Sequence, residues 1–243
     1  MKKILIVGAG GQIGSELTEH LRGIYGQHQV IAADIHGDRE DNDFVHLDAL
    51  DAEAMARVVR EQRIDTIFNL VALLSATGEA NPQKAWRVNM GALMNALEVA
   101  REYNCAVFTP SSIGAFGPDA PKDGTPQDTP MHPTTIYGVC RVTGELLGNY
   151  YFQRFGVDAR SVRLPGVISS QALPGGGTTD YAVEVFYAAL RGERFVCPVP
   201  HDRFMDMIYM PDVLDAMVGL MEADPARLKH RNGYNVASMS FSP

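Results

Sequence analysis

The 243-residue sequence predicts an α/β fold, a doubly wound parallel sheet with helices on both faces and a small C-terminal lobe. Short apolar runs alternate with helical patterns from the first residues onward. A glycine-rich turn follows the first apolar run and opens the first helix. After Pro165 the alternation loosens into segments rich in glycine and proline. We therefore expect a main domain over residues 1–165 and a lobe over residues 166–243, interleaved with that domain.

Each expected element follows from its residue pattern. Apolar runs rich in β-branched residues predict strands over residues 3–7, 30–33, 44–47, 66–70, 107–110 and 159–164. Helical periodicity predicts helices over residues 12–25, 52–62, 81–104, 134–155, 181–190 and 211–222. Asn81-Pro82 is typical of a helix start, because asparagine caps the first turn and proline is tolerated there. We expect the C-terminal lobe to lie over the carboxyl ends of the strands, where such sheets bind ligands.

Composition excludes several classes of partner. Twenty-one Lys and Arg against 29 Asp and Glu give a net charge of −8, which disfavours nucleic acid and anionic membranes. The longest apolar run, over residues 67–74, falls short of a membrane span and contains Asn69. The N-terminus lacks the long apolar stretch of a signal peptide. The three cysteines are far apart, and no Cys/His cluster has zinc-ligand spacing. These features predict a cytoplasmic protein with a small-molecule substrate and no metal.

The glycine-rich turn has the pattern of a dinucleotide-binding loop. Gly8, Gly11 and Gly14, with Gln12 and Ile13 between the last two, lie between the first strand and the first helix. Glycines at this spacing allow a tight turn, close approach of the backbone to a pyrophosphate, and close packing of helix on strand. The helix N-terminus also presents unpaired N–H groups to the phosphates. Glycines alone also mark ordinary turns, so a second signal is needed.

An acidic residue supplies that signal. Asp34 lies 20 residues after Gly14, at the end of the second strand, where its carboxylate can accept both adenosine-ribose hydroxyls. The same carboxylate would repel a 2′-phosphate, which favours NAD over NADP, although nearby Arg39 leaves NADP open. Asp48, after the third strand, is expected either to meet the adenine edge or to cap its own loop. Together these residues predict a Rossmann-type domain that binds NAD.

A second group of residues has the chemistry of a proton-transfer site. Ser112 follows the strand that ends near Pro110, so its hydroxyl should lie at the carboxyl edge of the sheet. Tyr137 and Arg141 are four residues apart near the start of a long helix and share one face. A cation beside a phenol favours the phenolate, which can take a proton from an alcohol. The alternatives are that Tyr137 is a core residue and that Ser111-Ser112 is a turn.

These motifs resemble the extended short-chain dehydrogenase/reductase superfamily, whose pattern is Gly-x-x-Gly-x-x-Gly, a Ser or Thr, and Tyr-x-x-x-Lys. Within it the chain is most similar to the short-chain type of L-threonine 3-dehydrogenase. The matching segments are residues 11–17, 72–76, 78–79, 81–82, 110–113, 174–182, 210–212, 234–235 and 237–241. The most specific is the glycine triplet followed by Thr-Thr-Asp-Tyr-Ala, over residues 175–182.

The resemblance implies oxidation of the L-threonine β-hydroxyl to 2-amino-3-ketobutyrate, with hydride passing to the nicotinamide of NAD. It implies that Tyr137 takes the hydroxyl proton, that Ser112 hydrogen-bonds the same oxygen, and that Arg141 holds the nicotinamide ribose. The residues expected to contact substrate are Ser75, Gly177, Thr178 and Thr179, and those expected to line the cofactor are Leu70, Ala72, Asn89 and Leu164. Alternatively, residues 178–180 cap the following helix, and Asn89 is a buried amide satisfied by backbone.

Two departures from the family pattern affect these expectations. Arg141 stands where the family has its catalytic lysine. The chain ends at Ser242-Pro243, where members of the family continue through further helices, so the substrate lobe is expected to be shortened. A homodimer through the helices over residues 81–104 and 134–155 is expected by analogy of fold.

Two other functions stay open. A nucleotide-sugar epimerase or dehydratase would need a basic pocket, for which Arg191, Arg194 and Arg203 are candidates. A catalytically weak NAD-binding sensor is the other, indicated by Arg141 in place of lysine.

Overall fold

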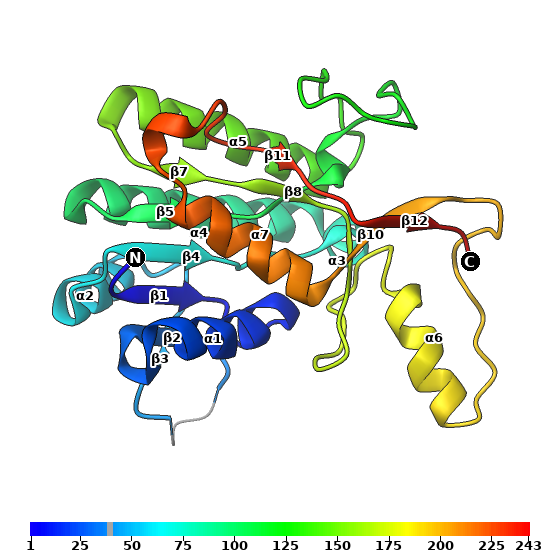
Figure 1. Cartoon of the computed structure of the whole chain (residues 1–243), viewed down its shortest axis with the longest axis horizontal. Helices are drawn as coiled ribbons and strands as arrows, with labels where there is room; N and C mark the ends of the chain where they lie inside the picture. The colour runs from blue at the N-terminus through cyan, green and yellow to red at the C-terminus, as the bar shows by residue number, and fades with distance from the viewer. Residues whose placement is uncertain (38–40) are drawn as a thin grey trace.

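A parallel sheet of six strands forms the centre of the molecule (Figure 1). The computed structural model describes residues 1–37 and 41–243. The strands are β1 (Ile4–Val7), β2 (Val30–Asp34), β3 (Phe44–His46), β4 (Thr66–Asn69), β5 (Ala106–Phe108) and β7 (Ala159–Arg160). Their order is β3-β2-β1-β4-β5-β7, and every neighbouring pair is parallel. This is the strand order of a Rossmann fold, so the predicted fold class is confirmed.

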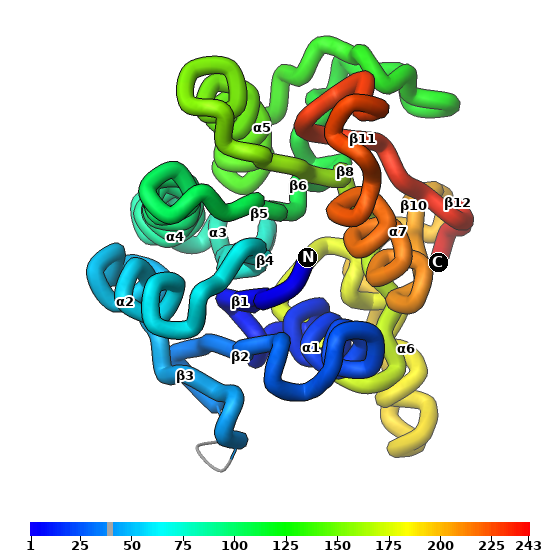
Figure 2. The backbone as a smooth tube through the Cα atoms, turned by 60° about the vertical axis from the view of Figure 1, so that its left-hand side comes forward, coloured from blue at the N-terminus to red at the C-terminus, as the bar shows by residue number. Residues whose placement is uncertain are grey.

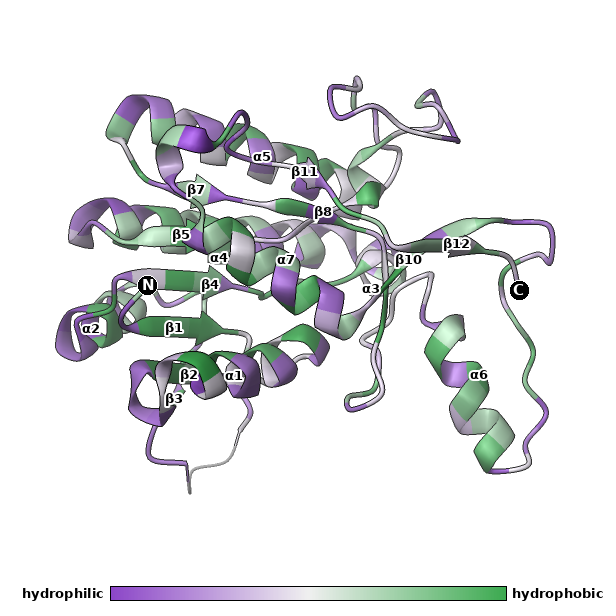
Figure 3. Cartoon of the chain, in the orientation of Figure 1, coloured by the Kyte–Doolittle hydropathy of each residue, from purple (hydrophilic) through white to green (hydrophobic). Residues whose placement is uncertain are grey.

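Helices cover both faces of this sheet, as Figure 2 shows with the strands in the middle. One face carries α2 (Ala52–Gln62), α4 (Pro82–Tyr103) and α5 (Ile136–Phe155), and the other carries α1 (Gln12–Tyr25) and α7 (Met210–Glu222). Each face buries its own apolar core. Figure 3 shows the hydrophobic colour of β1 and β2 between these helical layers. The doubly wound arrangement therefore follows from strands that are apolar on both sides.

Helix ends follow the residues that can satisfy free backbone groups. The Asn81 side chain accepts a hydrogen bond from Lys84 N at 3.1 Å, and Pro82 is the first residue of α4. Asn104 ends this helix in the left-handed conformation with φ 57°. Asp51 caps α2 in the same way as Asn81, accepting from Ala54 N at 2.9 Å. The expected start of α4 at Asn81-Pro82 is confirmed.

Beside the large sheet, the described residues form two smaller sheets of three strands each. One consists of β6 (Ser111–Ser112), β8 (Val162–Leu164) and β11 (Tyr234–Asn235). The other consists of β9 (Gly166–Ile168), β10 (Met205–Tyr209) and β12 (Met239–Phe241). The remaining elements are α3 (Ser75–Ala80), α6 (Tyr181–Leu190) and the 3-10 turns η1 (Gln27–Gln29), η2 (Ile113–Ala115) and η3 (Pro225–Arg227).

The single strand expected over residues 159–164 is wrong in one respect. Residues on the two sides of Ser161 belong to different sheets, β7 in the large sheet and β8 in a small one. Their side chains are anchored in opposite parts of the molecule. Arg160 donates to the carbonyl oxygens at the end of α7, whereas Arg163 pairs with Glu145 on α5. The chain therefore leaves the large sheet after β7 and enters the small sheet at β8, with an anchored arginine on each side of Ser161.

The C-terminal residues divide between the main body and a projecting part. Helix α7 packs in the core beside α1, whereas α6 lies away from the large sheet (Figure 1). The buried residues Tyr181 and Ala182 of α6 and Met207 of β10 form a small separate cluster. The division at residue 165 remains a prediction. Among the described residues, no helix is both long enough and apolar enough to span a membrane.

Candidate active site

Two glycines of the glycine-rich loop, Gly8 and Gly14, leave no room for a side chain. Gly8 has φ +91°, and a Cβ atom on it would lie 3.1 Å from Val71 N. A Cβ atom on Gly14 would lie only 2.1 Å from the carbonyl oxygen of Gly8. No side chain of the described residues caps α1 at Gly11, so the first N–H groups of this helix face the loop without such a partner. The loop therefore has the shape of an anion-binding turn, and the start of α1 supplies free N–H donors.

Asp34 lies beside this loop at the carboxyl end of β2. Its Oδ2 atom accepts a hydrogen bond from Gly10 N at 2.9 Å, and Oδ1 accepts one from His36 N at 3.0 Å. Each oxygen keeps a lone pair for a further donor. Arg39 lies outside the described residues. Asp48 is exposed and accepts from Leu50 N at 2.9 Å, which is the loop-capping bond of the alternative interpretation.

Ser112 and Tyr137 meet at Gly114. A Cβ atom on Gly114 would lie 3.3 Å from two ring carbons of Tyr137 and 3.4 Å from Ser112 Oγ. Gly114 N donates to Ser112 Oγ at 3.1 Å, which leaves the serine proton free to donate. Thr135 caps α5 by accepting from Gly138 N at 3.0 Å, and this fixes the first turn that carries Tyr137. Strand β6 and helix α5 thus bring the two side chains together.

Arg141 lies against the ring of Tyr137. Its guanidinium carbon is 4.7 Å from the ring centre, and Nη1 donates to Pro110 O at 2.7 Å. Nε is buried and has no partner among the described residues. Arg141 is therefore held inside the site and does not point into solvent. The structure places the predicted triad of Ser112, Tyr137 and Arg141 in one location.

Two of the residues expected to contact substrate, Ser75 and Thr178, lie side by side although they are far apart in the sequence. Ser75 Oγ and Thr178 Oγ1 are 3.2 Å apart although 103 positions separate them. The Asp180 carboxylate accepts from Gly176 N at 2.8 Å and from Gly177 N at 2.7 Å. It makes no capping bond to α6, so this part of the capping alternative is wrong. Thr179 packs on Gly166, where a Cβ atom would lie 2.6 Å from Thr179 Cβ.

The segment after β4 runs past the glycine loop. Asn89 is buried and holds this segment, because its side chain accepts from Leu73 N at 2.7 Å and donates to Leu73 O at 3.1 Å. These are the backbone bonds of the alternative interpretation of Asn89. Leu70 and Ala72 flank Val71, which contacts Gly8, and Leu164 is buried at the end of β8. Their contact with a cofactor remains a prediction.

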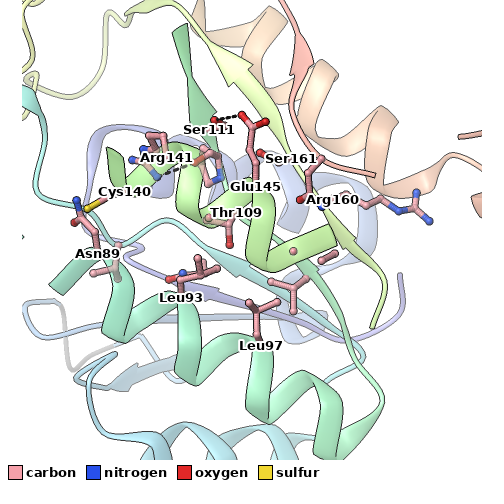
Figure 4. Close-up of a pocket in the computed structure, with 18 residues that line it drawn as sticks. Asn89, Leu93, Leu97, Thr109, Ser111, Cys140, Arg141, Glu145, Arg160 and Ser161 are labelled. Atoms are coloured by element: carbon pink, nitrogen blue, oxygen red, sulfur yellow. Dashed lines mark hydrogen bonds between the residues drawn. The ribbon is translucent and has the colours of Figure 1, made fainter. Parts of the chain in front are cut away.

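A small cavity lies behind the triad, between α4, α5 and the sheet (Figure 4). Its volume of about 30 Å³ admits water but no substrate. Cys140 borders it, and burial raises the pKa of this thiol despite the nearby Arg141 charge. Cys140 is therefore a protonated thiol at neutral pH and a poor nucleophile. Within residues 1–37 and 41–243, no group of acidic, His and Cys side chains could hold a metal ion.

Sequence reasoning missed a buried ion pair next to this cavity. Glu145 on α5 binds Arg163 on β8, with Nη2 to Oε2 at 2.8 Å and both side chains almost fully buried. A glutamate in a helix is normally expected on the surface. The available signal was its spacing, because Glu145 follows Arg141 by four residues and so shares the face of Tyr137.

Comparison with known proteins identifies the family of the chain. The model of the NAD dependent epimerase/dehydratase family matches residues 4–237. Over its whole length the chain is 54% identical to an uncharacterised epimerase/dehydratase of Staphylococcus haemolyticus and covers 78% of it.

The chain is also similar to solved structures of L-threonine dehydrogenases. L-threonine dehydrogenase from Phytophthora infestans superposes with a TM-score of 0.96 at 50% identity, covering all of this chain and 78% of that one. The holo form of a GalE-like L-threonine dehydrogenase from Cupriavidus necator has a TM-score of 0.95 at 48% identity, with coverage of 99% and 79%. The predicted resemblance to short-chain L-threonine 3-dehydrogenases is confirmed, and it supports an NAD-dependent oxidoreductase. The chain belongs to the NAD-dependent epimerase/dehydratase family.

Proposed function

We propose that the protein oxidises the β-hydroxyl of L-threonine to 2-amino-3-ketobutyrate with NAD as hydride acceptor. The observation that carries this proposal is the meeting of Ser112 and Tyr137 at Gly114, with Arg141 against the tyrosine ring. A hydroxyl donor, a phenol and a fixed cation at one point can remove the hydroxyl proton of an alcohol as it is oxidised. The similarity to L-threonine dehydrogenases of known structure supports the choice of substrate.

The residues of the glycine loop fit NAD. A loop that excludes Cβ atoms at Gly8 and Gly14 lets the backbone approach a pyrophosphate, and the start of α1 supplies N–H donors and a positive dipole end. Asp34 can accept the ribose hydroxyls with its remaining lone pairs, and its charge opposes a 2′-phosphate. When bound, NAD supplies the nicotinamide that accepts the hydride.

The chain's own residues manage the proton. Tyr137, as phenolate, takes the proton from the substrate hydroxyl oxygen while the hydride leaves the carbon that bears this hydroxyl, and a ketone forms. Ser112 donates its hydroxyl proton to the reacting oxygen, while Gly114 N occupies one of the two lone pairs on Ser112 Oγ. Arg141 keeps its charge at any physiological pH and stabilises the phenolate. Its bond to Pro110 O holds the guanidinium in place.

The remaining polar groups fit a small amino acid. The hydroxyls of Ser75 and Thr178 lie 3.2 Å apart, and only one proton is used between them. One donor and several lone pairs are therefore available to the ammonium and carboxylate groups of the substrate. Gly177 and Thr179 flank Thr178 in a loop whose backbone is held by a hydrogen bond from Gly177 N to the Asp180 carboxylate.

The epimerase alternative has less support in the structure. Two of its three candidate arginines are exposed and paired with acidic neighbours, Arg191 with Glu193 at 2.8 Å and Arg203 with Asp202 at 3.7 Å. Such side chains form a solvated surface rather than a diphosphate pocket. The sensor alternative rests on one observation, Arg141 in the position of lysine, and the same experiment tests it.

The test offers L-threonine, L-serine, 3-hydroxybutyrate and a UDP-sugar separately to the purified full chain, and measures NADH formation and conversion of each compound. Binding of NAD is measured in parallel by titration calorimetry. Steady NADH formation with L-threonine alone supports the proposal. Binding of NAD without turnover of any substrate supports the sensor. Conversion of a UDP-sugar without net NADH formation supports the epimerase.

A further inference from the structure

The buried pair of Glu145 and Arg163 lies one helical turn beyond Arg141 and has no part in the proton transfer. Arg163 Nε donates to Glu145 Oε1 at 2.9 Å and Nη2 donates to Oε2 at 2.8 Å, so the pairing is bidentate. The side chains are 5% and 6% exposed. Burying two charges costs about as much as their attraction returns, so stability alone is a weak reason for this pair. Its third partner indicates another role.

That third partner is Ser111, whose hydroxyl donates to Glu145 Oε1 at 2.5 Å (Figure 4). Ser111 is the strand neighbour of Ser112. Successive side chains of a strand point to opposite faces, so one serine faces Glu145 while the other faces Gly114 and Tyr137. Glu145 therefore holds the strand through Ser111, the serine that does not face the reacting groups.

Helix α5 contacts this segment at successive positions. Tyr137, Arg141 and Glu145 are spaced four residues apart on one face of the helix. Arg141 bonds Pro110 O at 2.7 Å, and Glu145 bonds Ser111. The two residues before Ser112 are thus tied to the helix that carries Tyr137.

The Glu145 carboxylate is itself fixed. Arg163 Nη1 donates to Gln127 O and to Asn235 Oδ1, each at 2.9 Å, so the arginine is held by two further segments. A Cβ atom on Gly233 would lie 2.3 Å from Glu145 Oε2, which shows how closely the backbone covers the carboxylate. Strand β8 pairs Arg163 with Ser111 on one side and Asn235 on the other. The acceptor for Ser111 therefore has little freedom to move.

We propose that Glu145 and Ser111 are positioning residues that hold Ser112 in register with Tyr137. The inference rests on the proposed function, because it assigns to this pair the placement of a group that contacts the reacting oxygen. Displacement of such a group by about 1 Å costs on the order of 100-fold in rate. A strand of only two residues, β6, has few backbone bonds of its own to prevent that displacement.

The first test is Ser111→Ala, which removes one hydroxyl and leaves the Glu145–Arg163 pair intact. We expect kcat with L-threonine to fall about 10- to 100-fold. The KM for L-threonine and the KM for NAD should stay within about threefold of the wild type. Ser111→Thr keeps a donor and should restore most of the rate. The matched control is Ser161→Ala, because Ser161 is also buried but its hydroxyl has no partner among the described residues.

A double-mutant cycle separates positioning from general damage. If Ser111 acts through Ser112, Ser111→Ala should lower kcat no further in a Ser112→Ala background. An equal loss in both backgrounds, or no loss in the wild-type background, would overturn the inference. Because the cycle compares rates, it requires a wild type that oxidises L-threonine.

Hydrogen exchange provides a readout that needs no turnover. The Gly114 amide donates to Ser112 Oγ, so its exchange reports whether this serine keeps its place. We expect exchange of Gly114 to be about tenfold faster in Ser111→Ala and unchanged in Ser161→Ala. Unchanged exchange in Ser111→Ala would overturn the positioning role. A wild type that forms no NADH with L-threonine would refute the proposed function instead, and the exchange result would still decide the inference.

Discussion

The substitution Tyr137→Phe removes the phenol oxygen and little else. No described residue makes a hydrogen bond to this oxygen, so no partner is left unsatisfied in the variant. The ring keeps its place over Arg141, 4.7 Å away, and its contact with Gly114. The unfolding free energy should therefore change by less than about 0.5 kcal/mol. Loss of the general base should lower kcat by about 10²- to 10⁴-fold, or about 3–5 kcal/mol of transition-state stabilisation.

The assay compares initial rates of NADH formation, thermal melts and NAD binding for wild type and variant. The matched control is Tyr150→Phe, because Tyr150 lies on the same helix and is 52% exposed. This control should match the wild type in all three measurements. A Tyr137→Phe variant with a rate within about threefold of the wild type would refute the role of Tyr137 as the base.

Three further substitutions test the other roles. Arg141→Lys should raise kcat with little change in NAD affinity, because lysine can also release a proton, and equal kcat values would contradict this. Asp34→Ala should weaken NAD binding by about 10- to 100-fold, because charged hydrogen bonds to the ribose are lost. The preference for NAD over NADP, measured by titrating the protein with each cofactor, should become smaller. Wild-type protein that binds both equally would contradict the role of Asp34. Thr178→Ala should raise the KM for L-threonine more than it lowers kcat. A lower melting temperature with unchanged KM would indicate a structural role for Thr178.

The elements that sequence predicted best are those with a local reason to begin and end. Helix α4 has Asn81 and Pro82 at its start and Asn104 in the left-handed conformation at its end. Strands β1 and β4 were found because they are buried on both sides and therefore form nearly continuous apolar runs. These signals need no knowledge of distant residues.

The short elements could not be found in this way. Strands β6 and β11 have two residues each, and their pairing with β8 depends on segments far along the chain. Helix α3 has six residues and contains Gly78, so it has no helical periodicity to detect. The split at Ser161 arises from side-chain anchors on either side of it, which a local pattern does not reveal.

The candidate site shows the same division. Tyr137 and Arg141 share a helix face, so their proximity follows from spacing alone. The contact of Ser75 with Thr178 bridges 103 positions, and only family resemblance indicated a shared role. Arg163 lies in a strand whose sequence pattern gives no sign of an ion pair. Its pairing with Glu145 depends on how α5 packs. Polar contacts between residues far apart in the sequence therefore could not be predicted from local patterns.

The position of α7 has a consequence for how the protein folds during synthesis. Met210 and Met217 of this helix are fully buried in the same core as Phe68 and Phe108 of β4 and β5, two aromatic rings whose centres are 5.5 Å apart. The ribosome releases the strands long before it releases α7. Until then, the face of the sheet that carries these rings lacks its cover and is a target for chaperones and for aggregation. The N-terminal residues therefore complete their native structure only after α7 has emerged.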